Sequence, residues 1–178
     1  MARAFDEENE RVKRKYLDRM GEAHGCDPAT LDKIADALLL FEQSTKFKSF
    51  KTFHIEQAKR FKAEALDATS SRTGQPLALS TVSGRLALVI ALCGWLSDEV
   101  GYKSRISYQD ADYFNLTKKD QRIAHTSRGT PYPTMQQCKR AFEAMPNETI
   151  LDRRNRAIFA CLMLTGARDG ALTSFQLK

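Results

Sequence analysis

The chain has few cysteines, and their spacing excludes a disulfide framework. Its 178 residues include four cysteines, and no two of them form a CxxC pair. Three fall on apolar faces of predicted helices, so we interpret all of them as reduced packing residues of a cytosolic protein: Cys26, Cys93, Cys138 and Cys161. His24 and His54 have no partners at the spacing of metal ligands, and we expect them at the surface or at helix caps. The sequence therefore predicts no metal site.

Several other signatures are missing. The chain contains no GxxxxGK[ST], GxGxxG, HExxH or GxSxG pattern, which disfavours ATP-driven, nicotinamide-dependent and zinc-hydrolytic functions. The longest apolar stretch, residues 86–96, is shorter than a membrane span requires. The amino-terminal residues, with an acidic segment from Asp6 to Glu10, have no apolar core of the kind that a secretory signal needs. We expect a cytoplasmic protein that binds neither a membrane nor a cofactor.

Apolar residues recur at spacings of three and four, and no stretch alternates with a period of two. This pattern predicts an all-α protein. We expect a helix that ends near Gly25, a second that opens with Asp27 as cap and Pro28 as first residue, and others over about 53–68 and 81–99. Capping boxes at 107–110, 134–137 and 149–152 open three further helices, the first of them short.

The predicted helix over about 81–99 combines a broad apolar face with a stripe of small residues, which lets a neighbouring helix approach closely. We expect it at the centre of a bundle. Its polarity is concentrated near the amino-terminal end, at Ser80, Thr81, Ser83 and Arg85. Free backbone N–H groups there can bind phosphate. The alternative is that Ser80 only caps the helix and Arg85 is only a surface charge.

The net charge of +6 is unevenly distributed. Residues 1–43 carry a balance of −3, whereas residues 44–109 and 117–140 each carry +5. Residues 116–133 show no apolar period, and we interpret them as a basic interdomain linker. Positive charge concentrated in the middle of a chain favours a polyanionic partner, although many basic domains are merely well solvated.

Arg168 is the candidate catalytic residue. It lies in the segment 165–172 (TGARDGAL), directly after the apolar run 157–164. An arginine on a glycine turn between a buried helix and the next helix can present two fixed donors to a phosphate; the alternative is an ordinary arginine at a helix end. Residues 153–172 resemble the opening of the catalytic domain in the tyrosine recombinase (phage integrase) family, where the matching arginine is the first catalytic residue.

The resemblance implies a division of the chain into three parts. Residues 1–115 look like the SAM-like helical core-binding domain of that family, 116–133 would be the linker, and 134–178 would begin the catalytic domain. In the family a tyrosine hydroxyl attacks a DNA phosphodiester and forms a 3′-phosphotyrosine, without metal or nucleotide. The remaining catalytic residues would come after Lys178, so this chain alone is expected to be an inactive part of a DNA integration and recombination enzyme.

Some features depart from the family pattern. The family usually has an acidic residue three positions after the arginine, where this chain has Ala171; Asp169 is the nearest carboxylate and the candidate replacement. His125 and Arg128 have the family's His-x-x-Arg spacing, but they precede Arg168 and lie in the predicted linker, so we interpret the match as coincidence. We expect the tyrosines to be packing residues: Tyr16, Tyr102, Tyr108, Tyr113 and Tyr132.

The resemblance also implies duplex DNA as partner, together with further recombinase protomers in a synaptic complex and a place on the nucleoid when DNA is bound. Candidate contacts to backbone phosphates are one threonine and a set of basic residues: Lys33, Lys46, Lys48, Lys51, Thr81, Arg85, Lys103, Arg105, Lys118, Lys119, Arg122 and Arg128. Two other functions stay open at this point. One is a stand-alone helical DNA-binding regulator without chemistry, and the other is a protein-interaction bundle.

Overall fold

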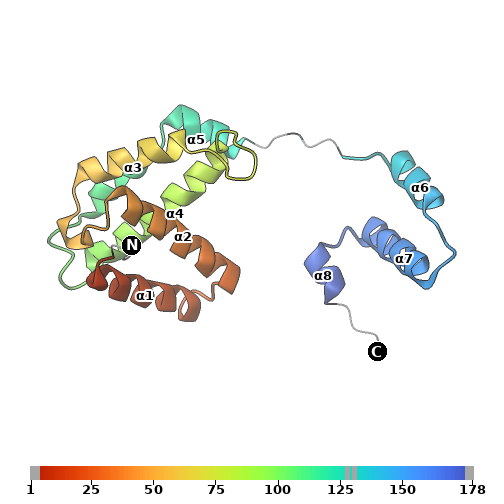
Figure 1. Ribbon diagram of the computed structural model, residues 1–178, viewed down its shortest axis with the longest axis horizontal. Helices are drawn as coiled ribbons and strands as arrows, with labels where there is room; N and C mark the ends of the chain where they lie inside the picture. The colour runs from red at the N-terminus through yellow and green to blue at the C-terminus, as the bar shows by residue number, and fades with distance from the viewer. Residues whose placement is uncertain (1–4, 127–128, 130–131, 175–178) are drawn as a thin grey trace. The chain divides into compact units, whose positions relative to one another are not determined.

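The computed structural model describes residues 5–126, 129 and 132–174, and within them every regular element is helical (Figure 1). This confirms the prediction of an all-α protein. The helices, in chain order, are α1 (Glu7–Glu22), α2 (Pro28–Ser44), η1 (Phe50–Thr52), α3 (Ile55–Asp67), α4 (Leu79–Asp98), η2 (Tyr108–Phe114), α5 (Lys118–His125), α6 (Met135–Ala144), α7 (Ile150–Thr165) and α8 (Asp169–Thr173). The two η elements are 3₁₀ helices.

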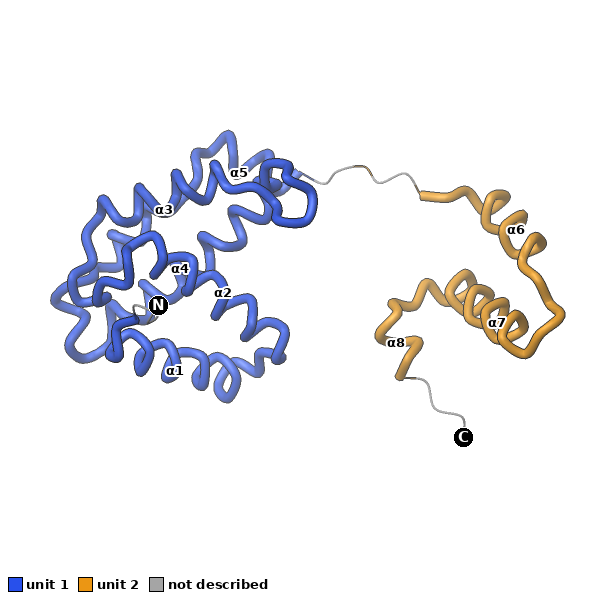
Figure 2. The backbone as a smooth tube through the Cα atoms, in the orientation of Figure 1, with its two compact units in different colours: residues 1–127 blue, residues 128–178 orange. Residues whose placement is uncertain are grey.

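The chain forms two compact units, residues 1–127 and 128–178 (Figure 2). The boundary between the units falls inside the segment 116–133, which was predicted as a linker. The first part of that segment forms helix α5 and belongs to the first unit, because α5 packs against α4. The Thr117 hydroxyl caps α5 by accepting from the Asp120 N–H at 3.2 Å, and Leu116 beside it is buried. An eight-residue helix is too short to reveal an apolar period, which is why the sequence pattern suggested a linker.

Helix α4 is the central element of the first unit, as its sequence predicted. It contacts α2, α3, α5 and η2. Its buried side chains form the middle of the core: Val82, Leu86, Val89, Leu92, Cys93 and Leu96. By length and composition alone α4 would also suffice to cross a membrane, with a mean hydropathy of 1.6. Here its apolar face packs instead against the aromatic cluster of Phe41, Phe50, Phe61 and Phe114 and the other core residues.

Most helix starts agree with the caps expected from the sequence. Asp27 caps α2, and the three capping boxes at 107–110, 134–137 and 149–152 are all formed. His54 is a cap as well, since its Nδ1 accepts from the Glu56 N–H at 3.3 Å. Helix α4 differs: it begins at Leu79 after Ala78, which offers no side-chain cap, so Ser80 lies within the first turn and does not cap the helix.

The second unit consists of α6, α7 and α8, with little interior of its own. The Arg156 guanidinium donates to the carbonyl oxygens of Phe142 and Met145 at 2.8 and 2.7 Å, and Phe142 stacks on Phe159. Among the described residues of this unit, Cys138 is the only buried apolar side chain. The prediction that α7 is a buried helix is therefore wrong for this unit, because two helices and a turn cannot enclose its apolar side chains.

Candidate nucleic-acid interface

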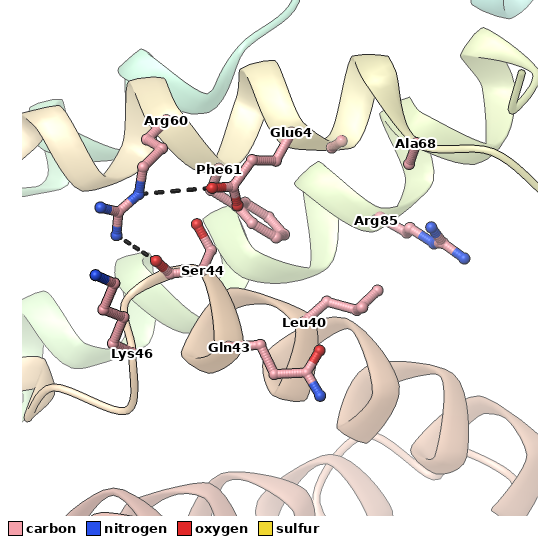
Figure 3. A pocket seen from close by; sticks show the side chains of 10 residues that line it. Leu40, Gln43, Ser44, Lys46, Arg60, Phe61, Glu64, Ala68 and Arg85 are labelled. Carbon is pink, nitrogen blue, oxygen red and sulfur yellow. Dashed lines mark hydrogen bonds and ion pairs between the residues drawn. The ribbon is translucent and has the colours of Figure 1, made fainter. Parts of the chain in front are cut away.

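A groove of about 500 Å³ lies between α2, α3 and α4 in the first unit (Figure 3). Leu40 and Phe61 are among its apolar wall residues, and Ala65 and Ala68 continue that wall along α3. The polar residues that line it are Gln43, Ser44, Lys46, Arg60, Glu64 and Arg85. We call this hollow the α2–α3–α4 groove.

Three cationic side chains surround the groove and only one carboxylate does. Lys46 and Arg60 lie close to each other at one end, and Arg85 lies at the other end (Figure 3). Arg60 donates from Nη2 to the carbonyl oxygen of Ser44, and its Nε lies 3.7 Å from Glu64 Oε1. Side chains of Arg60 and Glu64 are about half exposed, so this pair is screened by water and leaves the positive charge of the groove in place.

Arg60 is a site residue that the sequence analysis did not select. It lies in the segment 59–62 of α3 together with two lysines and one phenylalanine, and nothing in the local pattern separates it from Lys59 and Lys62. Its position in the groove depends on how α3 packs against the end of α2, which is a tertiary contact. The sequence offers one indication that Arg60 lies near the core, namely that it directly precedes Phe61, which is buried.

Lys46 is held in the groove by an unusual helix end. Lys46 and Phe47 have positive φ angles of 57° and 56°. The Phe47 N–H donates to the Glu42 carbonyl at 2.7 Å and the Lys46 N–H donates to the Gln43 carbonyl at 3.1 Å. This is the Schellman pattern that usually has glycine after the helix. The lysine is therefore fixed by backbone bonds at a position that few residue types favour.

One buried hydroxyl in the groove has no partner among the described residues. Ser44 Oγ is buried and makes no hydrogen bond, although Ser44 lines the groove beside Lys46 and Arg60. A hydroxyl can donate to an anionic oxygen. The end of the groove near α2 therefore has two cations, and the unpaired Ser44 hydroxyl beside them is shielded from solvent.

Two other predicted contacts of the same segment lie outside the groove. Lys48 is exposed, and its backbone carbonyl accepts from Asn9 Nδ2 at 3.0 Å. Lys51 Nζ lies 2.5 Å from Glu8 Oε1 and 5.6 Å from the centre of the Tyr102 ring. Lys51 is thus already paired with a carboxylate, which weakens its case as a phosphate contact.

The remaining predicted contacts are spread over the first unit, and the structure does not place them in the groove. They are exposed side chains: Lys33, Thr81, Lys103, Arg105, Lys118, Lys119 and Arg122. Lys118 and Lys119 occupy the first turn of α5, and Thr81 occupies the first turn of α4. Arg128 lies outside the described residues.

Arg168 is exposed and stands directly before α8, in the N-cap position. Gly166 ends α7 in the left-handed conformation with φ 62°, so the expected glycine turn is present. The Asp169 carboxylate accepts from the Gly170 N–H at 2.8 Å, and no ion pair between described residues includes Arg168. Residue 171, three positions after Arg168, is an alanine in α8, so it offers no carboxylate to the Arg168 guanidinium.

The tyrosines divide into two groups. Tyr16 and Tyr102 are buried, as expected of packing residues. Tyr108, Tyr113 and Tyr132 are 74%, 41% and 84% exposed, so the prediction of buried packing residues is wrong for them. Burial, followed by the nearby Glu8 and Asp6 carboxylates, raises the pKa of Tyr102 to about 12. A phenol so hard to deprotonate is a poor nucleophile at neutral pH.

The cysteines are free thiols without metal-ligand neighbours. Cys93 and Cys138 are buried, and Cys26 and Cys161 are half-buried. Burial raises the pKa of Cys93 to about 12, so this thiol stays protonated and unreactive. In the part of the chain that the structure describes, no three His, Cys, Asp or Glu side chains gather closely enough to hold a metal ion.

Comparison with known proteins adds no relative to these observations. No family model, no curated protein and no solved structure matches the chain.

Proposed function

We propose that the first unit binds the phosphate backbone of duplex DNA through the α2–α3–α4 groove. The observation that carries this proposal is the gathering of Lys46, Arg60 and Arg85 around one hollow that holds a single carboxylate, Glu64. Cations without matching carboxylates attract a polyanion and release its counterions when it binds. Contacts of this kind position a protein on DNA and carry no sequence information.

A second hollow of the same unit shows why the groove is the better candidate. That hollow, of about 320 Å³, lies between α1 and the end of α4 and is lined by three cations, Arg11, Lys15 and Lys51, and by two carboxylates, Glu8 and Glu99. Lys15 pairs with Glu99 at 2.6 Å, and Lys51 pairs with Glu8 at 2.5 Å. Two carboxylates oppose three cations there, whereas one carboxylate opposes three cations in the α2–α3–α4 groove, so less positive charge is left for a phosphate.

We further propose that the chain is the amino-terminal portion of a site-specific tyrosine recombinase. Support comes from the resemblance of residues 153–172 and from the exposed position of Arg168 after the glycine turn. A guanidinium aimed at the non-bridging oxygens of the attacked phosphodiester would stabilise the negative charge of the transition state. The first unit would supply a SAM-like core-binding domain, and further protomers would join it in a synaptic complex.

The alternative function, a stand-alone DNA-binding regulator, makes a different prediction for the coding sequence after codon 178. A recombinase continues with a lysine, a His-x-x-Arg motif and a nucleophilic tyrosine, as the family resemblance implies. A stop codon at that point would favour the regulator. Neither result changes the expectation for the groove.

The groove is tested by titrating a duplex of about 20 base pairs with the protein at several salt concentrations. Affinity should fall steeply with salt, and Arg85→Ala and Arg60→Ala should each weaken binding and reduce the salt slope by about 1. Arg11→Ala is the matched control, because this arginine is exposed on α1 and lines no part of the groove. Weak binding that ignores salt, or equal losses in all three variants, would contradict the proposal; a protein-interaction bundle would not bind the duplex at all.

A further inference from the structure

Asn9 is a buried amide that joins three segments of the first unit. It lies in the first turn of α1 and has no exposed surface. Its Nδ2 donates to Glu42 Oε1 at 3.2 Å and to the Lys48 carbonyl at 3.0 Å, and its Oδ1 accepts from the Phe50 N–H at 2.9 Å. The amide thus uses both donors and one acceptor inside the protein.

Two of these bonds clamp the segment after α2 from the side. The Lys48 carbonyl and the Phe50 N–H flank Ser49, and the Asn9 amide pairs with both as the backbone of a neighbouring strand would. A two-point contact fixes both the position and the orientation of the backbone. The segment between Lys46 and Phe50 therefore has one defined path.

The same segment would relax without such support. Lys46 and Phe47 both have left-handed φ angles, and each costs on the order of 1 kcal/mol or more for a residue other than glycine. The Glu42 carbonyl accepts from the Phe47 N–H and from the Thr45 hydroxyl at 3.0 Å. Glu42 is therefore connected to the segment twice, through its own carbonyl and through its side-chain bond to Asn9.

We infer that Asn9 is a positioning residue for DNA binding, acting on the segment that presents Lys46 to the groove. This inference rests on the proposed function of the α2–α3–α4 groove. A cation that is already fixed loses less conformational entropy when a phosphate binds, so the affinity is higher than for the same lysine on a mobile loop. Asn9 itself is fully buried and touches no ligand, so its influence passes through the backbone of residues 46–50.

The test is a double-mutant cycle on the full chain with a duplex of about 20 base pairs. Asn9→Ala should weaken binding roughly five-fold in the wild-type background. In the Lys46→Ala background the same substitution should have no further effect, because the lysine through which it acts is gone. Exchange of the Phe50 amide hydrogen should accelerate in Asn9→Ala.

Several results would overturn the inference. Equal weakening in both backgrounds would mean that Asn9 acts through general stability, and unchanged affinity in the wild-type background would mean that it does not act on binding. If Asn9→Ala does not fold, Asn9→Ser replaces it, since a hydroxyl is too short to reach both Lys48 and Phe50. Val12→Ala on the same helix controls for loss of packing and should leave affinity unchanged. Absence of binding by the unsubstituted protein would instead contradict the proposed function.

Discussion

The Lys13–Glu42 pair brings two charges into the interior of the first unit. Glu42 is fully buried, and its Oε2 accepts from Lys13 Nζ, which also donates to Glu10 at 2.6 Å. Burial alone would lower the pKa of Lys13, but the hydrogen bonds to Glu10 and Glu42 outweigh it and raise the pKa above 10.5. Since paired buried charges are costly to separate, this pair fixes α1 against the end of α2.

Lys13→Met should destabilise the protein by about 3 kcal/mol, because it leaves the Glu42 carboxylate buried without its cation. Lys15→Met is the control: this lysine is 64% exposed, and loss of its pair with Glu99 should cost less than about 1 kcal/mol. A raised lysine pKa stabilises the fold below pH 10.5 and loses that effect as pH rises through the folded-state value. Urea unfolding should therefore show that the free energies of unfolding of the unsubstituted protein and of Lys13→Met converge at strongly alkaline pH. Equal losses of stability for Lys13→Met and Lys15→Met at neutral pH would contradict this prediction.

These polar interior residues could not be found from the sequence. Asn9, Lys13 and Glu42 lie among many charged residues on α1 and α2, and nothing in the local pattern separates them from their exposed neighbours. They are distinguished only by the way the loop after α2 folds back over α1. Arg60 was missed for the same reason. Arg85 and Lys46, the two predicted contacts that line the α2–α3–α4 groove, lie in local patterns that a sequence shows directly, a polar helix start and a segment with three lysines between residues 46 and 51.

Helix starts were the most predictable elements. A cap is a bond between residues three apart, so Asp27 and the capping boxes can be recognised from local sequence alone. The predicted start of α4 at about residue 81 was too late, because Ser80 has the residue type of a cap although Ala78 holds the N-cap position. Of the two 3₁₀ helices, η2 was predicted as a short helix from its capping box, whereas the three-residue η1 was not predicted.

Ala78→Ser should stabilise the protein by about 1 kcal/mol. Ala78 has an extended backbone with φ −62° and ψ 139°, which suits an N-cap, but it has no side-chain oxygen to accept from the first turn of α4. A serine would supply that acceptor. The control is Ala63→Ser in the exposed middle of α3, where serine should cost about 0.5 kcal/mol because it is a weaker helix former. Thermal unfolding followed by circular dichroism compares the two, and a lower Tm for Ala78→Ser would contradict the expected cap.

The two units differ in how much core each contains. The main hydrophobic cluster, with members on every helix from α1 to α4 and on η2, belongs entirely to residues 1–127. In residues 128–178 the described apolar side chains other than Cys138 are exposed or half-buried, with Leu164 at 87% and Ile150 at 83% exposed. The predicted boundary at residue 115 was too early because α5 packs on α4. The small core of the second unit agrees with its size, since some 45 residues seldom bury enough apolar surface to fold alone.

Residues 1–127 expressed alone should unfold cooperatively in urea and bind duplex DNA with the salt slope of the whole chain, because the core and the α2–α3–α4 groove both lie in this unit. Residues 128–178 alone should show no cooperative transition, because two helices held by Arg156 and the Phe142–Phe159 stack bury too little apolar area. The measurements are circular dichroism during urea titration and duplex affinity at several salt concentrations. If residues 1–127 fold but bind much more weakly than the whole chain, cations of the second unit carry the affinity and the groove is not the principal contact.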